Sequence, residues 1–159
     1  DIGSGNGKNV IGIETGGIFC LDTCLPFLEI TKDQGLESIR GSMTQVPFRS
    51  ASLDIILCVA AFHHLSSKER RLAALMEMNR ALVKGGRMFL TVWSKEQPTK
   101  IRRVFKEYGA NYVPWNGGNP RYYYIFRIDE IKELLYETGF NIDRHYWDCG
   151  NEIFIVCKK

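Results

Sequence analysis

The chain has 159 residues, of which 45% are hydrophobic and 25% are charged, and its net charge is +3. These values are typical of one globular domain with its own core and leave little length for a second domain. No apolar run is long enough to cross a membrane, and the mild basicity permits a polyanionic partner without requiring one.

The five cysteines are scattered along the chain, and no two of them form a Cys-x-x-Cys pair. This spacing argues against a zinc site, and we predict that the chain holds no metal. Cys20, Cys58 and Cys157 lie in apolar runs, which is typical of small buried side chains in a reducing compartment. We therefore expect a cytoplasmic location, with the nucleus as a second candidate.

The first eight residues, Asp1–Lys8, combine an acidic residue with three alternating glycines, Gly3, Gly5 and Gly7. Such a run suits a strand that ends in a tight turn, where a ligand meets the backbone without a Cβ in between. A P-loop needs four residues between its first glycine and Gly-Lys, and a dinucleotide fingerprint needs G-x-G-x-x-G, so neither motif fits. The pattern acidic-x-G-x-G-x-G resembles motif I of the S-adenosylmethionine-dependent methyltransferases. An ordinary glycine-rich loop is the remaining alternative.

Asp1 occupies the position at which the first strand of such a fold normally ends. We therefore expect further residues upstream in the natural protein. Residues 1–159 are predicted to form a single methyltransferase domain that lacks its N-terminal helix and the start of its first strand.

Helices and strands alternate along the rest of the chain. Helices are predicted over residues 10–13, 26–34, 69–83 and 128–138, and a basic helical insertion is predicted over residues 96–112. Strands are predicted over residues 18–21, 36–40, 55–59, 88–92, 141–147 and 153–157. This order predicts an α/β fold, a doubly wound Rossmann-like sheet that is mostly parallel with an antiparallel C-terminal hairpin strand.

The helix over residues 69–83 carries the clearest local signals. Ser66 is predicted to cap it, with Glu69 completing a capping box, and Lys84–Gly86 is predicted to end it. Its apolar stripe places Met76 toward the core and leaves Met78 off the stripe.

Ligands of open α/β sheets bind at the carboxyl ends of the strands. Asp22 ends the predicted strand over residues 18–21 and lies 19 residues after Gly3, close to the ~20-residue offset at which an acid meets a ribose. We favour this role over a helix N-cap. Ser42-Met43 is predicted to lie in a loop beside an adenine ring, and His63-His64 follows the strand over residues 55–59.

Several blocks together resemble one family, the eukaryotic tRNA wobble-uridine methyltransferases that esterify 5-carboxymethyluridine. The blocks are Asp1–Lys8, Ala61–Arg71, Val92–Gln97, Val113–Trp115, Arg121–Tyr123 and Tyr146–Asn151. The sequence departs from that family at Ser42, where an Asp is usual, and in the short segment between Gln97 and Val113.

The resemblance implies a cofactor, S-adenosylmethionine, and two sets of site residues. Cofactor-binding residues would be Asp1, Gly3, Gly5, Gly7, Asp22, Thr23, Ser42, Met43 and Ala60. Catalytic or substrate-positioning residues would be His63, His64, Arg121 and Tyr122. A core or capping histidine, a solvated arginine and a packed tyrosine are the structural alternatives.

The implied substrate is the carboxylate of 5-carboxymethyluridine in a tRNA anticodon loop, which becomes a methyl ester. Aromatic side chains, including Tyr123, Trp93 and Trp115, are candidates to wall the site or to stack on a base. A basic strip is a candidate to face phosphates, and it consists of Lys95, Lys100, Arg102, Arg103 and Lys106.

A partner is also expected. The strand Leu36–Arg40 is thin and polar, as at a sheet edge, where unpaired backbone groups accept a further strand. The resemblance implies a small zinc-binding activator protein at this edge. Two other functions remain open: methylation of a small carboxylate metabolite, and a non-catalytic scaffold for a partner protein.

Overall fold

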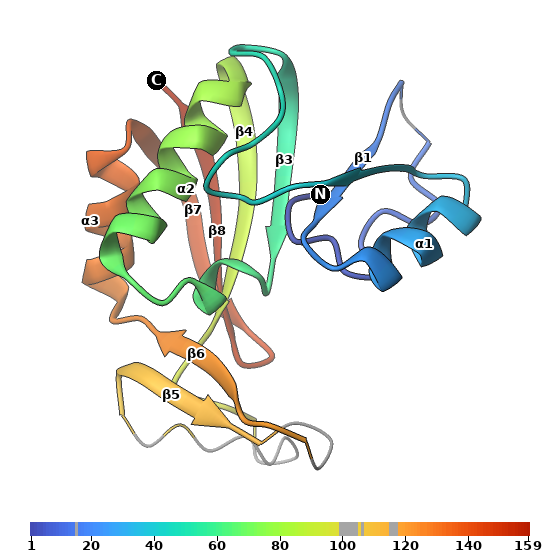
Figure 1. The fold of residues 1–159 in the computed structure, drawn as a ribbon. Coiled ribbons are helices and arrows are strands. Elements are labelled where there is room, and N and C mark those ends of the chain that lie inside the picture. The colour runs from blue at the N-terminus through green and yellow to red at the C-terminus, as the bar shows by residue number, and fades with distance from the viewer. Residues whose placement is uncertain (15, 99–104, 106, 115–117) are drawn as a thin grey trace.

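The computed structural model describes residues 1–14, 16–98, 105, 107–114 and 118–159 (Figure 1). Its strands are β1 (Phe19–Asp22), β2 (Glu37–Arg40), β3 (Leu53–Val59), β4 (Leu82–Trp93), β5 (Gly109–Val113), β6 (Arg121–Ile125), β7 (Phe140–Asp148) and β8 (Asn151–Lys158). Its helices are α1 (Leu25–Asp33), α2 (Lys68–Ala81), α3 (Ile128–Glu137) and a short 3-10 turn, η1 (Phe62–His64). None of the described helices is both long and apolar enough to span a bilayer.

The main strands form a mixed sheet. β1 pairs with β2 in parallel, β3 pairs with β4 in parallel, and β8 lies antiparallel between β4 and β7. Asp1 and Ile2 join the two groups of strands, because Ile2 N donates to Leu57 O of β3 (2.8 Å) and Leu21 N of β1 donates to Asp1 O (2.9 Å). The predicted α/β fold with its antiparallel C-terminal hairpin is confirmed.

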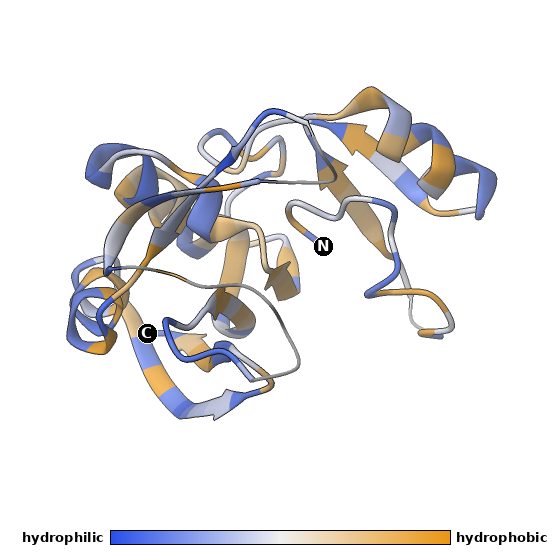
Figure 2. Cartoon of the chain, turned by 90° about the horizontal axis from the view of Figure 1, so that it is seen from below, coloured by the Kyte–Doolittle hydropathy of each residue, from blue (hydrophilic) through white to orange (hydrophobic). Residues whose placement is uncertain are grey.

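The helices bury one face each. α2 and α3 pack on one side of the β3-β4-β8-β7 sheet, and α1 packs on β1 and β2 (Figure 1). The helix ribbons carry both hydrophilic and hydrophobic residues, as amphipathic helices do (Figure 2). In α2 the buried residues follow a helical spacing, and they are Arg71, Ala74, Leu75, Met78 and Ala81.

The predicted helix over residues 10–13 does not form. Successive turns replace it: Val10 N donates to Gly7 O (3.0 Å), and Ile13 N donates to Val10 O (3.2 Å). Three β-branched residues disfavour a helix here, and Gly12 has a φ of 77°, which no right-handed helix permits.

Two details predicted for α2 are also wrong. Its N-cap is Ser67, whose side chain accepts a hydrogen bond from Arg70 N, not Ser66. α2 ends at Ala81 without a glycine cap, because β4 begins at the next residue. Gly85 and Gly86 lie in a register shift between β3 and β4, where a Cβ on Gly86 would lie 2.9 Å from Val83 O.

The predicted helical insertion over residues 96–112 is a strand in its described C-terminal part. β5 pairs antiparallel with β6, and this hairpin lies beyond the carboxyl end of β4 (Figure 1). Residues 99–104 and 106 lie outside the described part of the chain. The aromatic residues of β6 make the strand possible, since aromatic side chains favour a half-buried pleated surface.

Met78 and Met76 offer a matched test of the core. Met78 is completely buried and Met76 is 61% exposed, the reverse of the sequence prediction. We expect Met78→Ala to lower the free energy of unfolding by about 2–5 kcal/mol, because it leaves a cavity. Met76→Ala should change it by less than about 0.5 kcal/mol, as surface substitutions do. Urea unfolding followed by circular dichroism measures both, and equal losses would contradict this packing.

Candidate active site

The glycine turn lies between β1 and β3 and is held by close contacts. Gly3, Gly5 and Gly7 have φ values of 73°, 52° and 78°, so all three lie in the region that favours glycine. A Cβ on Gly3 would lie 2.4 Å from Ala61 Cβ, and one on Gly7 would lie 2.9 Å from Thr31 Cγ2. A Cβ on Gly5 would have no neighbour within 4 Å. The turn therefore packs on two sides and leaves open space beside Gly5.

Asp22 joins the end of β1 to this turn. Its Oδ2 accepts from Gly5 N (2.9 Å), and its Oδ1 accepts from Cys24 N (2.9 Å). The carboxylate thus links the glycine turn to the residue before α1, whose N-cap is Cys24 and not Asp22. Each oxygen keeps a further lone pair for a hydroxyl donor. Thr23, the next residue, is exposed.

Two further segments meet the glycine turn. Met43 lies beside Gly3, since its Cε would be 3.6 Å from a Cβ built there. The neighbouring Ser42 hydroxyl is 2.8 Å from Thr44 Oγ1. Ala60 follows β3 with a φ of 52°, and its N donates to Thr91 Oγ1 (2.9 Å). A non-glycine residue held in this conformation is strained, and such strain concentrates at functional sites.

The two histidines of η1 differ in burial and in tautomer. His63 is buried, and its Nδ1 accepts from Trp93 N (3.2 Å), so a neutral His63 carries its proton on Nε2. His64 is exposed, and its Nδ1 lies 2.9 Å from Tyr122 O. A carbonyl oxygen only accepts, so Nδ1 of His64 carries the proton and a neutral His64 presents a lone pair at Nε2.

His64 is kept in its neutral form by its surroundings. Desolvation lowers the pKa of His64 below its ordinary value, and the positive charge of Arg121 lowers it further, while the hydrogen bond to the Tyr122 carbonyl opposes both effects. Because the ordinary pKa of histidine is near 6.5, His64 is mainly uncharged at pH 7. The neutral His64 thus lies within the electrostatic influence of Arg121, which is permanently charged.

The hairpin β5–β6 supplies an aromatic wall. Tyr123 is buried and stacks on Trp93, with ring centroids 4.2 Å apart, and both rings lie near His63. Tyr122 points to the opposite face of β6, because side chains alternate along a strand. Its hydroxyl donates to Ser66 O (3.2 Å). Of the predicted substrate residues, the structure brings together His63, His64 and Arg121, whereas Tyr122 reaches His64 only through its backbone carbonyl.

Sequence reasoning missed three residues that shape the site. Ala61 lets Gly3 approach, Thr91 holds Ala60, and Phe105 packs on Trp93 with ring centroids 5.7 Å apart. The only signal for them in the sequence is the small size of Ala61, two residues after the strand that ends at Val59.

Several predicted residues lie outside the described part of the chain, and they are Lys100, Arg102, Arg103, Lys106 and Trp115.

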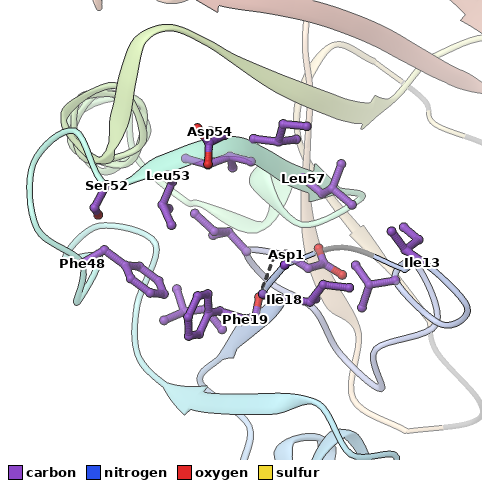
Figure 3. A pocket seen from close by; sticks show the side chains of 16 residues that line it. Asp1, Ile13, Ile18, Phe19, Phe48, Ser52, Leu53, Asp54 and Leu57 are labelled. Atoms are coloured by element: carbon purple, nitrogen blue, oxygen red, sulfur yellow. Dashed lines mark hydrogen bonds between the residues drawn. The ribbon is translucent and has the colours of Figure 1, made fainter.

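An apolar cavity of about 620 Å³ borders the start of the chain, where Asp1 and Ile2 form part of its lining (Figure 3). Its walls include Val10, Ile13, Phe19, Phe48 and Leu53. The cavity runs along β1 and β3, and Asp1 is the one predicted cofactor-binding residue that lines it. It is not the crevice that the sequence predicts for a cofactor.

The residues at the strand ends fit S-adenosylmethionine. Asp1 Oδ1 is enclosed and accepts no hydrogen bond from the described residues, so it suits a donor such as an amino group. Gly5 leaves space at the turn, Asp22 has lone pairs for ribose hydroxyls, and Met43 offers an apolar surface for a ring. No cluster of three or more metal-binding side chains occurs in the described part of the chain.

Alanine substitutions at Gly5 and Gly3 distinguish the space that we assign to the cofactor from the space that is filled by packing. We expect Gly5→Ala to cost about 1 kcal/mol of stability, from backbone strain alone, and to weaken S-adenosylmethionine binding at least about tenfold (~1.4 kcal/mol), because the methyl group fills the open space. Gly3→Ala should destabilise the fold more, since it collides with Ala61. Titration calorimetry and urea unfolding measure the two effects. Unchanged cofactor affinity in Gly5→Ala would contradict this placement.

Comparisons with known proteins agree with this geometry. The family model described as a methyltransferase domain matches residues 1–90. A Schizosaccharomyces pombe protein named tRNA (carboxymethyluridine(34)-5-O)-methyltransferase is 34% identical, and the match covers 100% of this chain and 79% of that protein.

Two solved structures share the fold. An S-adenosylmethionine-dependent methyltransferase from Methanosarcina mazei has a TM-score of 0.82 at 16% identity, covering 99% of this chain and 90% of that one. The amino pentose methyltransferase CalS10 from Micromonospora echinaspora, solved with S-adenosylmethionine bound, has a TM-score of 0.75 at 17% identity, covering 99% and 81%. The chain therefore belongs to the S-adenosylmethionine-dependent methyltransferases, within the family of the tRNA (carboxymethyluridine(34)-5-O)-methyltransferases.

Proposed function

We propose that this enzyme methylates the wobble uridine of a tRNA, at the carboxylate of 5-carboxymethyluridine, and forms the methyl ester. The observation that carries the proposal is the hydrogen bond between His64 Nδ1 and Tyr122 O, which joins η1 beside the glycine turn to the strand that begins at Arg121. An arginine binds a carboxylate as a bidentate donor, and a neutral imidazole nitrogen accepts from an N–H group. The similarity to the S. pombe enzyme over the whole chain supports the same substrate.

The reaction needs orientation more than proton transfer. A carboxylic acid has a pKa near 4, so the substrate is already an ionised nucleophile at pH 7. Bound S-adenosylmethionine supplies an electrophilic methyl group on its sulfonium. One carboxylate oxygen forms the new C–O bond while the S–C bond breaks, and the two opposite charges cancel without release of a proton. Arg121 holds the other oxygen, so the enzyme acts by positioning the reactants.

His64 then reads the base and not the carboxylate. Its Nδ1 proton is engaged by Tyr122 O, so the free Nε2 accepts from a donor such as the N3–H of uracil. Donation from His64 to the carboxylate would require a second proton, which its lowered pKa and the nearby Arg121 oppose. His63 is buried behind it and acts as a positioning residue for the Trp93 backbone.

The substrate is tested with anticodon stem-loops that carry uridine, 5-carboxymethyluridine or its amide at the wobble position. We expect labelled methyl transfer only to the carboxylate, with a product that mild alkali hydrolyses back to the acid. Arg121→Gln should lower kcat/KM by about 10²-fold or more, because it removes a charge-assisted bidentate contact (~3 kcal/mol). Equal methylation of unmodified uridine, or of a free carboxylate metabolite in preference to the RNA, would overturn the proposal.

We also propose a heterodimer with a small zinc-binding activator protein at the edge strand β2. In the described residues β2 pairs only with β1, so its other edge is open to a further strand. Exposed apolar side chains of α1 lie beside it, with exposed fractions of 47% for Leu25, 40% for Phe27 and 42% for Ile30. A partner that covers this surface would remove it from water.

Phe27→Glu tests the partner surface, with Tyr136→Glu on α3 as a matched control, since Tyr136 is 52% exposed and far from β2. We expect Phe27→Glu to weaken binding of the activator at least about tenfold (~1.4 kcal/mol), because it places a charge in an apolar contact. The control should bind normally in co-purification and calorimetry. A monomer that is soluble and fully active without any partner would refute the heterodimer.

A further inference from the structure

Two cations meet on one aromatic ring beside the candidate active site. Lys95 Nζ lies 4.8 Å from the centroid of the Tyr108 ring, and Arg127 Cζ lies 4.6 Å from the same centroid. Such distances are those of cation–π contacts. Tyr108 itself is 36% exposed and Arg127 is exposed, so solvent reaches this group.

Neither of these two cations forms an ion pair within 4.0 Å in the described part of the chain. The ion pairs of the described residues are Arg80–Glu77, Arg87–Asp143 and His145–Glu152, and none of them involves Lys95 or Arg127. The residues outside the described part include no Asp or Glu, so they hold no carboxylate partner either. Two like charges on one ring repel each other, and an incoming anion relieves that repulsion.

Sequence and packing place this group next to the aromatic wall. Lys95 follows Trp93 at the end of β4, and Arg127 follows β6 and precedes α3. Trp93 stacks on Tyr123 of β6, so both cations extend from the two strands that wall the candidate site.

We propose that Lys95, Tyr108 and Arg127 form a contact site for the phosphate backbone of the RNA nucleotides that flank the target uridine. The proposal rests on the proposed function, because it assigns the path of the RNA and not the chemistry. A cationic surface with an interleaved aromatic ring is typical of grooves that bind single-stranded nucleic acid, and anticodon nucleotides are single-stranded. An acidic protein could also bind these two charges. RNA is the better candidate, because the nucleotides that flank the target uridine must pass close to the reacting carboxylate.

The test compares two double variants of the full chain. Lys95→Gln with Arg127→Gln removes the two charges of the site, and Lys84→Gln with Arg49→Gln removes two exposed charges at the opposite end of the sheet. Affinity for a carboxymethylated anticodon stem-loop is measured across salt concentrations. We expect the first variant to lower the slope of log K against log salt by about 1 to 2 and the control to leave it unchanged.

Kinetics separate this site from the catalytic residues. The first variant should raise KM for the stem-loop about tenfold (~1.4 kcal/mol) while kcat and S-adenosylmethionine affinity stay unchanged. Lys95→Arg with Arg127→Lys keeps both charges and should restore the slope, which a folding defect would not allow. Equal slopes for the two Gln variants would overturn the inference. So would a Lys95→Gln, Arg127→Gln variant that binds RNA normally but no longer binds a protein partner. RNA that binds with the expected slope but is never methylated would refute only the proposed function.

Discussion

The backbone of Asp1–Gly3 is the constraint on which the rest of the structure depends. Its hydrogen bonds to Leu21 of β1 and Leu57 of β3 place the glycine turn at the carboxyl ends of both strands. Gly3 then approaches Ala61 so closely that no side chain fits between them. Because Ala61 directly precedes η1, the same contact positions the cofactor turn and the two histidines relative to each other. The cofactor and substrate halves of the site are therefore one packed unit.

This packing explains why strain is tolerated beside the site. Ala60 keeps a positive φ because the Thr91 hydroxyl holds its N–H and Gly3 packs against the next residue. Asp22 similarly accepts from Gly5 N and Cys24 N, so its carboxylate is oriented before any ligand arrives. Groups fixed in advance lose little entropy on binding, which favours affinity and precise orientation. A reaction that depends on positioning needs this rigidity.

Features set by local chemistry were predictable from the sequence, and features set by packing were not. The glycine turn, Asp22 at the end of β1 and the thin edge strand follow from residue types at fixed spacing. Met76 and Met78 differ by two positions on one helix, and only the neighbouring α3 and sheet decide which is buried. Likewise, Tyr122 and Tyr123 look equivalent in the sequence, but pairing with β5 sends Tyr123 onto Trp93 and Tyr122 to the other face.

The hydrogen bond from His64 to Tyr122 O has a further consequence for how the site works. It joins residues 58 positions apart in the chain, and it is the contact that decides which nitrogen of His64 carries the proton. The hairpin β5–β6 therefore sets the chemistry of a histidine that lies on a different element. A ligand that moved this hairpin would act on His64 through the same bond, because a shift of the Tyr122 carbonyl would release the His64 tautomer. The position of the hairpin and the hydrogen-bonding state of the site are thus linked by one backbone carbonyl.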